Sequence, residues 1–271
     1  MTLRRLVIYS AAVMIAAWVV FPLILVTLAA FTPRETLYAW PRPIWPRTFT
    51  LATMRTFLGA ADVVQSTWNS LAVAGMTIGL AFIVSAPAAY ALARYRFRGR
   101  EAVQLLVLAT KMFPAVILAI PLAVAFIRWG LYDTLAGVAL VHTAMAVPFV
   151  MTMVTGIFLA ISYELEEAAM TLGTSRLGAV VRITLPMALP GLAAAGIFTF
   201  ITSWNEVFAA SILTVDHRTL PALILNSVVG SGAGAPLDYR FAGGFFMIVP
   251  ALVIMLLIRR YLLTLWGVAL R

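Results

Sequence analysis

The stretch from Ser162 to Pro190 reads SYELEEAAMTLGTSRLGAVVRITLPMALP and is a polar island between two long apolar runs. Apolar residues recur in it at i, i+3, i+4 and i+7, which predicts one face of a short amphipathic helix, made of Leu165, Ala168, Ala169 and Leu172. Glu164, Glu167 and Thr171 fall on the opposite face. Ser162 is a suitable N-cap, and Gly173 suits a left-handed stop. We expect a docking element between two membrane spans.

The order of residues in this stretch resembles a known motif. Glu167-Ala168-Ala169, then Gly173, then Ile183-x-Leu185-Pro186 is similar to the EAA loop of ABC importer permeases, with the spacing of that family. In that family the loop is the coupling helix that seats in a cleft on a cytoplasmic ATPase subunit. The resemblance therefore implies that the ATPase-docking residues are Glu164, Glu167, Ala168, Ala169, Gly173, Ile183, Leu185 and Pro186. Leu172 stands where the family often carries Asp, and a solvated connecting helix without a partner is the alternative.

The composition is that of a membrane protein. Of the 271 residues, 63% are hydrophobic and 11% charged, against about 45–50% and about 25% in soluble domains. The chain has no cysteine, and its two histidines, His142 and His217, are far apart, so we expect no metal site. The net charge of +9 does not indicate nucleic acid, because the arginines lie at the ends of apolar runs rather than on a basic patch.

The apolar runs predict an all-α integral membrane protein, with a single transmembrane domain over residues 1–271. Six spans are expected, at about 6–31, 68–92, 103–127, 135–161, 186–213 and 241–258. The coupling loop, 162–186, lies between the fourth and fifth spans. Pro114 and Pro121 interrupt the third span, and Pro186 and Pro190 fit the first turn of the fifth.

The arginines set the orientation. Alternating the loops places eleven on the cytoplasmic side: Arg4, Arg5, Arg94, Arg96, Arg98, Arg100, Arg176, Arg182, Arg259, Arg260 and Arg271. The other side holds seven, spread over longer loops: Arg34, Arg42, Arg47, Arg55, Arg128, Arg218 and Arg240. The positive-inside bias therefore predicts that both termini and the coupling loop are cytoplasmic.

A second resemblance narrows the family. The phrase from Asn69-Ser70-Leu71 to Ala88-Ala89-Tyr90-Ala91-Leu92-Ala93-Arg94-Tyr95-Arg96-Phe97-Arg98-Gly99-Arg100 looks like carbohydrate-uptake permeases of the maltose type. The resemblance implies the type I ABC importer permease fold in the cytoplasmic (inner) membrane of a prokaryote. It also implies a sugar as the substrate.

Two charged residues fall inside predicted spans. Lys111 lies either on the translocation path beside the Pro114 break or in a position to snorkel toward the cytoplasm. Glu206 follows Ser203-Trp204-Asn205, a cluster that resembles the fifth span of carbohydrate permeases. That resemblance implies that Trp204, Asn205 and Glu206 line the translocation path, and a structural ion pair or interhelical hydrogen bond of Glu206 is the alternative. His142 is expected to be a packed, hydrogen-bonded core residue.

The outer loop between Thr214 and Arg240 contains a glycine-rich segment. In the similar permeases this loop faces the solute-binding protein. By position, the contact residues are expected to include Gly230, Gly232, Gly234 and Asp238. An ordinary glycine-rich turn is the alternative.

The chain has no phosphate-binding P-loop, because its sole lysine, Lys111, has no preceding glycines at the required spacing. We therefore expect a non-enzymatic transport subunit without a cofactor of its own. The resemblance implies four kinds of partner besides membrane lipid: a second homologous permease, two cytoplasmic ATPase subunits that hold ATP and Mg, an external solute-binding protein, and the sugar. Import of a polyol or glycerol phosphoester, a gradient-driven transporter using Lys111 and Glu206, and a scaffold without transport are the alternatives.

Overall fold

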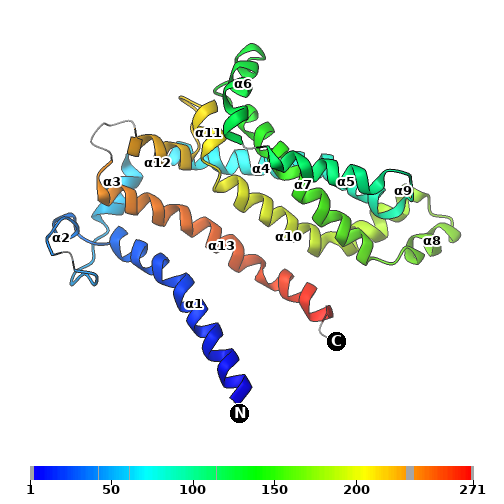
Figure 1. Cartoon of the computed structure of the whole chain (residues 1–271), viewed down its shortest axis with the longest axis horizontal. Coiled ribbons are helices and arrows are strands. Elements are labelled where there is room, and N and C mark those ends of the chain that lie inside the picture. The colour runs from blue at the N-terminus through cyan, green and yellow to red at the C-terminus, as the bar shows by residue number, and fades with distance from the viewer. Residues whose placement is uncertain (1–2, 42, 61, 114, 230–234, 270–271) are drawn as a thin grey trace. The chain divides into compact units, whose positions relative to one another are not determined.

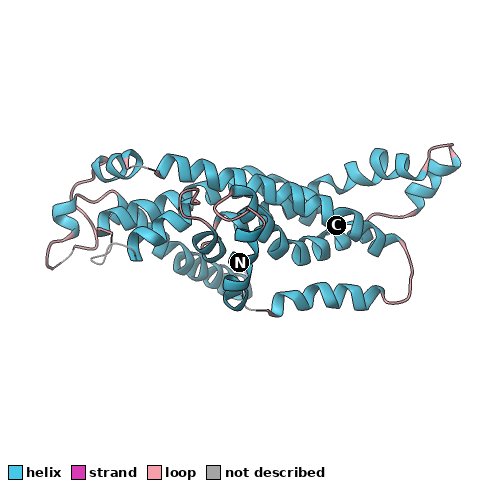
Figure 2. Cartoon of the chain, turned by 90° about the horizontal axis from the view of Figure 1, so that it is seen from above, coloured by secondary structure: helices cyan, strands magenta, loops and turns pink. Residues whose placement is uncertain are grey.

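The computed structural model describes all residues except 1–2, 42, 61, 114, 230–234 and 270–271. The described residues form helices and connecting loops, with no strand among them (Figure 2). The chain divides into two compact units. The first unit comprises Met1–Gln65 and Leu223–Pro250, and the second comprises Ser66–Ala222 and Ala251–Arg271.

The first unit is held together by aromatic side chains. Its helices are α1 (Leu3–Ala30), α2 (Arg34–Leu37), α3 (Ala52–Gly59) and the first part of α13 (Leu237–Ala269). Phe57 of α3 is completely buried and packs edge-on against Tyr239 of α13, with ring centroids 4.9 Å apart. Phe31, just after α1, packs in the same way on Phe245. These contacts attach α1 and α3 to α13.

The second unit contains most of the helices, which Figure 1 colours from cyan to yellow. They are α4 (Val63–Arg94), α5 (Arg100–Ala109), the 3-10 turn η1 (Thr110–Met112), α6 (Ala115–Arg128), α7 (Leu135–Ala160), α8 (Glu164–Thr171), α9 (Arg176–Ala179), the π turn η2 (Val180–Thr184), α10 (Leu185–Trp204) and α11 (Phe208–Leu213). Helix α12 (Leu220–Val229) begins in this unit.

Small residues let α4, α7 and α10 pack closely. Ala81, Ala89, Ala188 and Ala195 are all buried in one cluster with larger side chains such as Val154. Close approach of backbones at small residues is the usual way in which membrane helices associate, since lipid offers no hydrophobic driving force. A methyl group on Gly191 of α10 would lie 2.8 Å from the Ile157 side chain of α7. The glycine is therefore required by this contact.

Among the described residues, five helices are long and apolar enough to cross a membrane, and the number is six if one bent pair of helices forms a single span. This agrees with the predicted six-span, all-α membrane protein. The bent pair is Arg100–Met112 with Ile117–Arg128, which meet at 95° within the predicted third span. Phe113 has an extended backbone (ψ 118°) at the bend. The residue before a proline is disfavoured in the helical region, and Phe113 precedes Pro114 in the sequence.

The fifth predicted span, 186–213, is wrong at both ends. The spanning helix begins at Arg176 and ends at Trp204. The π turn at Val180–Thr184 continues the helix backwards from α10, so Pro190 lies inside the helix rather than in its first turn. At the other end the chain breaks after Trp204, and α11 is a separate helix. The sixth span begins at Leu237, four residues before the predicted start at 241.

Asp133 holds the corner that follows α11. Its backbone adopts a left-handed conformation (φ 55°), and its N–H donates to the Leu213 carbonyl at 2.8 Å. Its Oδ1 accepts from the backbone N–H groups of Val215, Asp216 and His217 at 2.8, 3.1 and 3.0 Å.

The N-terminal part of α4 holds the other end of the same corner. The Asn69 amide donates to the Arg218 carbonyl at 2.9 Å, and the Ser70 hydroxyl accepts from the Leu220 N–H at 2.8 Å. The path from α11 to α12 is thus fixed by three polar side chains from α4 and from the α6–α7 loop.

The Asp133 carboxylate accepts hydrogen bonds from the backbone N–H groups of Val215, Asp216 and His217, and these bonds form the Asp133 clasp. The Asp133 clasp predicts a pH-dependent contribution to stability. Burial alone would raise the pKa of the Asp133 carboxyl, but the backbone N–H groups of His217, Val215 and Asp216 outweigh burial and hold the pKa below its ordinary value. The stabilisation is therefore complete above the ordinary pKa of about 4 and is lost as the pH falls through the lower folded pKa. We expect Asp133→Asn to cost about 1–3 kcal/mol at pH 7. Its melting temperature in detergent should approach that of the wild type as the pH falls toward 3.

Asp216→Asn is the matched control, because Asp216 is exposed and contributes only its backbone N–H to the clasp. It should melt like the wild type throughout. If Asp133→Asn were as stable as the wild type at pH 7, the stabilising role of the Asp133 carboxylate would be contradicted.

Candidate functional site

Helix α8 lies within the polar island and is set by local sequence at both ends. Three glutamates, Glu164, Glu166 and Glu167, occupy its first turn, where the helix dipole favours negative charge. The N-cap position is Tyr163, which makes no side-chain cap, so the expectation that Ser162 caps the helix is wrong. The expected left-handed stop is confirmed, since Gly173 has φ 86°. Figure 1 shows α8 and α9 beyond the ends of α7 and α10.

Glu166 anchors α8 to the rest of the second unit. Its side chain is only 1% exposed. Its Oε1 accepts from Arg94 Nε at 2.9 Å and from the Thr184 hydroxyl at 2.7 Å, and its Oε2 accepts from the Tyr90 hydroxyl at 2.6 Å. Arg94 also donates from Nη1 to the Ile161 carbonyl at 3.0 Å. One carboxylate therefore joins α8 to the end of α4 and to the π turn before α10.

The surroundings of Glu166 keep it ionised. Burial alone would raise the pKa of this carboxyl, but hydrogen bonds from Tyr90 and Thr184 and the positive charge of Arg94 outweigh burial, so the pKa lies below its ordinary value. Glu166 is not among the docking residues that the EAA resemblance implies, because the motif begins at Glu167. The available signal was spacing: Glu166 precedes Ala169 by three residues and therefore shares the face that the structure buries.

The outward face of α8 carries most of the predicted docking residues. Glu164, Glu167 and Ala168 are exposed, and so are the apolar side chains of Leu165 (40%) and Leu172 (87%). Ala169 differs, because it is buried beside Glu166. The remaining predicted docking residues lie in the π turn and the first turn of α10, where Ile183 is half-buried and Leu185 and Pro186 are exposed.

A second polar cluster lies at the other end of α10. The His142 ring, from α7, has Nε2 at 3.1 Å from Glu206 Oε2 and Nδ1 at 2.8 Å from the Ser203 hydroxyl. Glu206 Oε1 and Oε2 also accept from the backbone N–H groups of Ala209 and Ala210 at 2.9 and 3.1 Å. Glu206 therefore caps the start of α11 and joins it to α7. The expectation of a packed, hydrogen-bonded His142 is confirmed.

The structure brings together two of the four residues predicted for the translocation path. Lys111, in η1, and Glu206 line one cavity of about 180 Å³. Trp204 is buried (1% exposed) and stacks on Phe200 with centroids 5.7 Å apart. Asn205 is exposed and donates its amide to the Ile201 carbonyl at 2.9 Å. Neither of these two side chains lines the cavity.

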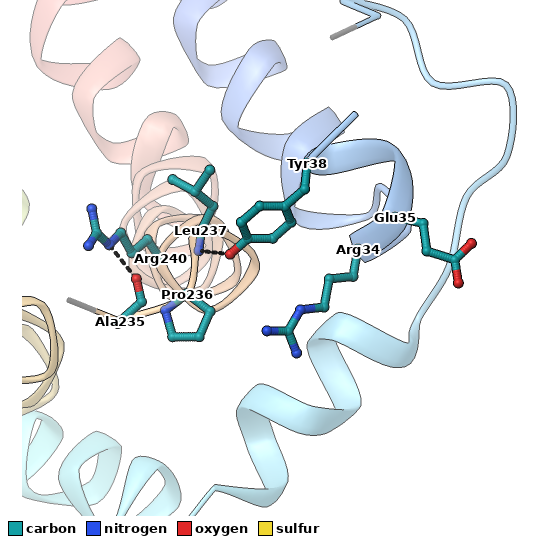
Figure 3. A pocket seen from close by; sticks show the side chains of 7 residues that line it. All are labelled: Arg34, Glu35, Tyr38, Ala235, Pro236, Leu237 and Arg240. Carbon is teal, nitrogen blue, oxygen red and sulfur yellow. Dashed lines mark hydrogen bonds between the residues drawn. The ribbon is translucent and has the colours of Figure 1, made fainter. Parts of the chain in front are cut away.

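Of the predicted contact residues of the outer loop, only Asp238 lies among the described residues. Gly230, Gly232 and Gly234 lie outside the described residues. Asp238, at the start of α13, is 14% exposed, and its Oδ1 is 4.0 Å from Arg34 Nε. A neighbouring open cavity of about 760 Å³ lies in the first unit. Figure 3 shows the residues that line it, among them Tyr38, whose hydroxyl accepts from the Leu237 N–H at 2.8 Å.

The chain is a multi-pass helical membrane protein whose second unit holds a clamped polar helix at one end. Residues 81–265 match the family described as binding-protein-dependent transport system inner membrane component. The chain belongs to this family, and it is therefore a component of ABC importers.

Named relatives and one solved structure agree with this assignment. The chain is similar to the trehalose transport system permease protein SugB of Mycobacterium tuberculosis, with 32% identity over 71% of each chain. It is also similar to the diacetylchitobiose uptake system permease protein NgcG of Streptomyces coelicolor, with 30% identity over 74% of this chain and 67% of the relative. A crystal structure of a bacterial ABC transporter involved in the import of the acidic polysaccharide alginate has the same fold, with a TM-score of 0.77 and 22% identity over 95% of this chain and 96% of the other.

The Glu166 anchor generates a stability prediction. We expect Glu166→Ala to destabilise the second unit by about 3–5 kcal/mol, because it leaves the buried Arg94 guanidinium without its carboxylate. The matched control is Glu167→Ala, which removes an exposed carboxylate from the same helix turn. Thermal melting of the purified chain in detergent would measure both variants, and equal melting temperatures for the two would contradict the anchor.

Proposed function

We propose that this permease imports a carbohydrate across the cytoplasmic membrane by alternating access, driven by ATP hydrolysis on partner subunits. Membership of the importer family supports the transport role. The names of the trehalose and diacetylchitobiose permeases support a sugar as the cargo. A polyol or glycerol phosphoester would use the same architecture and is separated from a sugar by the binding-protein titration described below.

The proposed complex has four other polypeptides. They are a second homologous permease, two cytoplasmic ATPase subunits that bind ATP and Mg, and a solute-binding protein on the outer side. The family description supports the binding protein, since it names binding-protein-dependent transport. Both termini of this chain are cytoplasmic in the proposal, and so is α8, in keeping with the arginine distribution. The chain itself holds no cofactor.

The observation that carries the proposal is the connection of α8 to two spans through Glu166. A force on the exposed face of α8 would pass through this carboxylate to Arg94 at the end of α4 and to Thr184 at the start of α10. Two exposed leucines, Leu165 and Leu172, give that face an apolar surface that a partner can cover. Closure of the ATPase dimer would then move α4 and α10 together and open the translocation path alternately to each side of the membrane.

The rest of the chain supplies the path and the outer contact. Lys111 and Glu206 face the path, while Trp204 and Asn205 support the turn that carries Glu206. The outer loop, with Gly230, Gly232, Gly234 and Asp238, contacts the binding protein. Polar groups beside interrupted helices are typical of transport sites, and both Lys111 and Glu206 lie at such interruptions.

The docking surface predicts a loss of coupling. Leu165→Glu places a charge on an exposed apolar side chain of α8 (40% exposed), and we expect uptake by the assembled importer to fall at least about tenfold, since one buried unpaired charge costs more than 1.4 kcal/mol at an interface. Leu165→Met, which keeps an apolar side chain, should retain uptake. Gly173→Val should behave like Leu165→Glu, because φ 86° is strained for valine. Normal ATP-driven uptake by both Leu165→Glu and Gly173→Val would contradict the coupling role.

Co-purification tests the complex itself. The chain, tagged at its N-terminus and extracted from native membranes in mild detergent, should bring down a P-loop ATPase, a second six-span protein and a solute-binding protein. That binding protein can then be titrated with sugars, polyols and glycerol phosphoesters. Recovery of this chain alone, under conditions that preserve other ABC complexes, would overturn the proposed composition.

A further inference from the structure

The segment 38–51, between α2 and α3 in the first unit, exposes large apolar side chains on a stretch that is mostly loop. Its exposed apolar residues are Tyr38, Trp40, Ile44, Trp45, Phe49 and Leu51, and Trp40 is the most exposed of them at 93%. We call this set the apolar patch. Large apolar side chains left uncovered in this number mark a surface that contacts something other than water.

Hydrogen bonds hold both ends of this segment beside the ends of two candidate membrane spans. Near its start, the Tyr38 hydroxyl accepts from the N–H of Leu237, the first residue of α13, at 2.8 Å (Figure 3). Near its end, the Thr50 N–H donates to the carbonyl of Phe31, the residue after α1, at 2.8 Å. Both α1 and α13 contain candidate spans. The segment therefore begins and ends at the level where a span leaves the hydrocarbon core and enters the headgroup region.

The residue types of this segment are those of a membrane interface. Trp and Tyr concentrate at headgroup level, because their rings are apolar while one polar group reaches water. Between residues 32 and 65 the sequence has four arginines, Arg34, Arg42, Arg47 and Arg55, and two acidic residues, Glu35 and Asp62. Arg47 and Arg55 are exposed, and a guanidinium binds phosphate through two parallel hydrogen bonds. Apolar rings and an excess of arginine match the acyl chains and the phosphates of a phospholipid.

An apolar cleft lies between the end of α1 and the returning part of the segment. Its volume is about 230 Å³, and its lining consists of Thr27, Leu28, Phe31, Phe49, Thr50 and Leu51. Helix α1 leads to this cleft with exposed apolar side chains, among them Trp18, Phe21 and Ile24. An acyl chain that lies along α1 can therefore end in the cleft, next to the Phe49 ring of the apolar patch.

We propose that segment 38–51 lies in the headgroup region of the bilayer, at the level where α1 ends, and binds phospholipid through its apolar patch. Trp40 and Trp45 contact the upper parts of the acyl chains, and Arg47 and Arg55 bind lipid phosphates. The bilayer fits better than a soluble protein, because the two hydrogen bonds keep the patch level with the span ends and continuous with the apolar surface of α1. The proposal concerns a surface of the first unit and holds whichever solute the importer carries.

A spin label tests the position of the patch, since the chain has no cysteine of its own and one introduced thiol can be labelled alone. Ile44→Cys places the label on the patch. Glu35→Cys is the matched control, because Glu35 is an exposed, charged residue of the neighbouring α2 whose side chain points away from Tyr38 (Figure 3). Each variant is purified with cysteine-free partner subunits, without the solute-binding protein, and reconstituted in vesicles of phosphatidylcholine with phosphatidylglycerol.

Electron paramagnetic resonance then measures how often the label collides with oxygen, which concentrates in hydrocarbon, and with a polar nickel complex, which stays in water. The ratio of oxygen to nickel collision rates should be at least about tenfold higher at Ile44→Cys than at Glu35→Cys, because a polar complex that loses 1.4 kcal/mol of hydration partitions tenfold less. Phe49→Cys should behave like Ile44→Cys, and this second position guards against a label that distorts the loop. Adding Trp40→Ser and Trp45→Ser to Ile44→Cys should lower its ratio toward that of Glu35→Cys.

Three results would overturn the proposal. Ratios at Ile44→Cys and Phe49→Cys equal to that at Glu35→Cys would place the patch in water. Low collision rates with both reagents would mean that a partner subunit covers it. A patch that is open to the nickel complex, and becomes closed to both reagents when the solute-binding protein is added, would instead be a docking surface for that protein. Uptake is not a readout here, so failure of the proposed carbohydrate import would leave this result unchanged.

Discussion

One buried ion pair determines how the polar loop of this protein is attached to its spans. Glu166 is the only carboxylate of α8 that points inward, and it meets Arg94, Tyr90 and Thr184 at once. Removing a charge from water is costly, so such a pair is retained only when its geometry satisfies nearly every polar atom. Because the partners come from α4 and from the turn before α10, the position of α8 is tied to both helices.

The same principle operates at the opposite end of α10. Glu206 meets the first N–H groups of α11 and His142 of α7, and Asp133 accepts three N–H groups just beyond α11. A six-residue helix has little stability of its own. Two carboxylates, one at each end, hold it in place, and one of them, Glu206, also lines the cavity that Lys111 lines. The break between α10 and α11 is therefore stabilised by polar side chains in addition to the apolar packing of Ala210 and Leu213.

Much of this architecture could be predicted from residue order. Apolar runs of spanning length and Gly173 after α8 are local signals, and they predicted the apolar spans, the polar island and its helix stop. The ends of the fifth span could not be predicted locally. Pro190 suits the first turn of a helix. The π turn at Val180–Thr184 nevertheless extends the helix back to Arg176, and the Thr184 hydroxyl in this turn donates to Glu166. The Thr184–Glu166 hydrogen bond joins residues 18 positions apart, so it is not visible in the local pattern around Pro190.

For the candidate sites too, part could be predicted from the sequence and part required the tertiary structure. The sequence by itself determined the class of protein and its apolar spans, because hydropathy and motif spacing are properties of neighbouring residues. Only the tertiary structure decided that Glu166 rather than Glu167 is the anchor, that Trp204 is buried, and that Lys111 and Glu206 share one cavity. The physical reason is that burial and pairing of a polar side chain depend on which helices approach it, and those helices are distant in the chain.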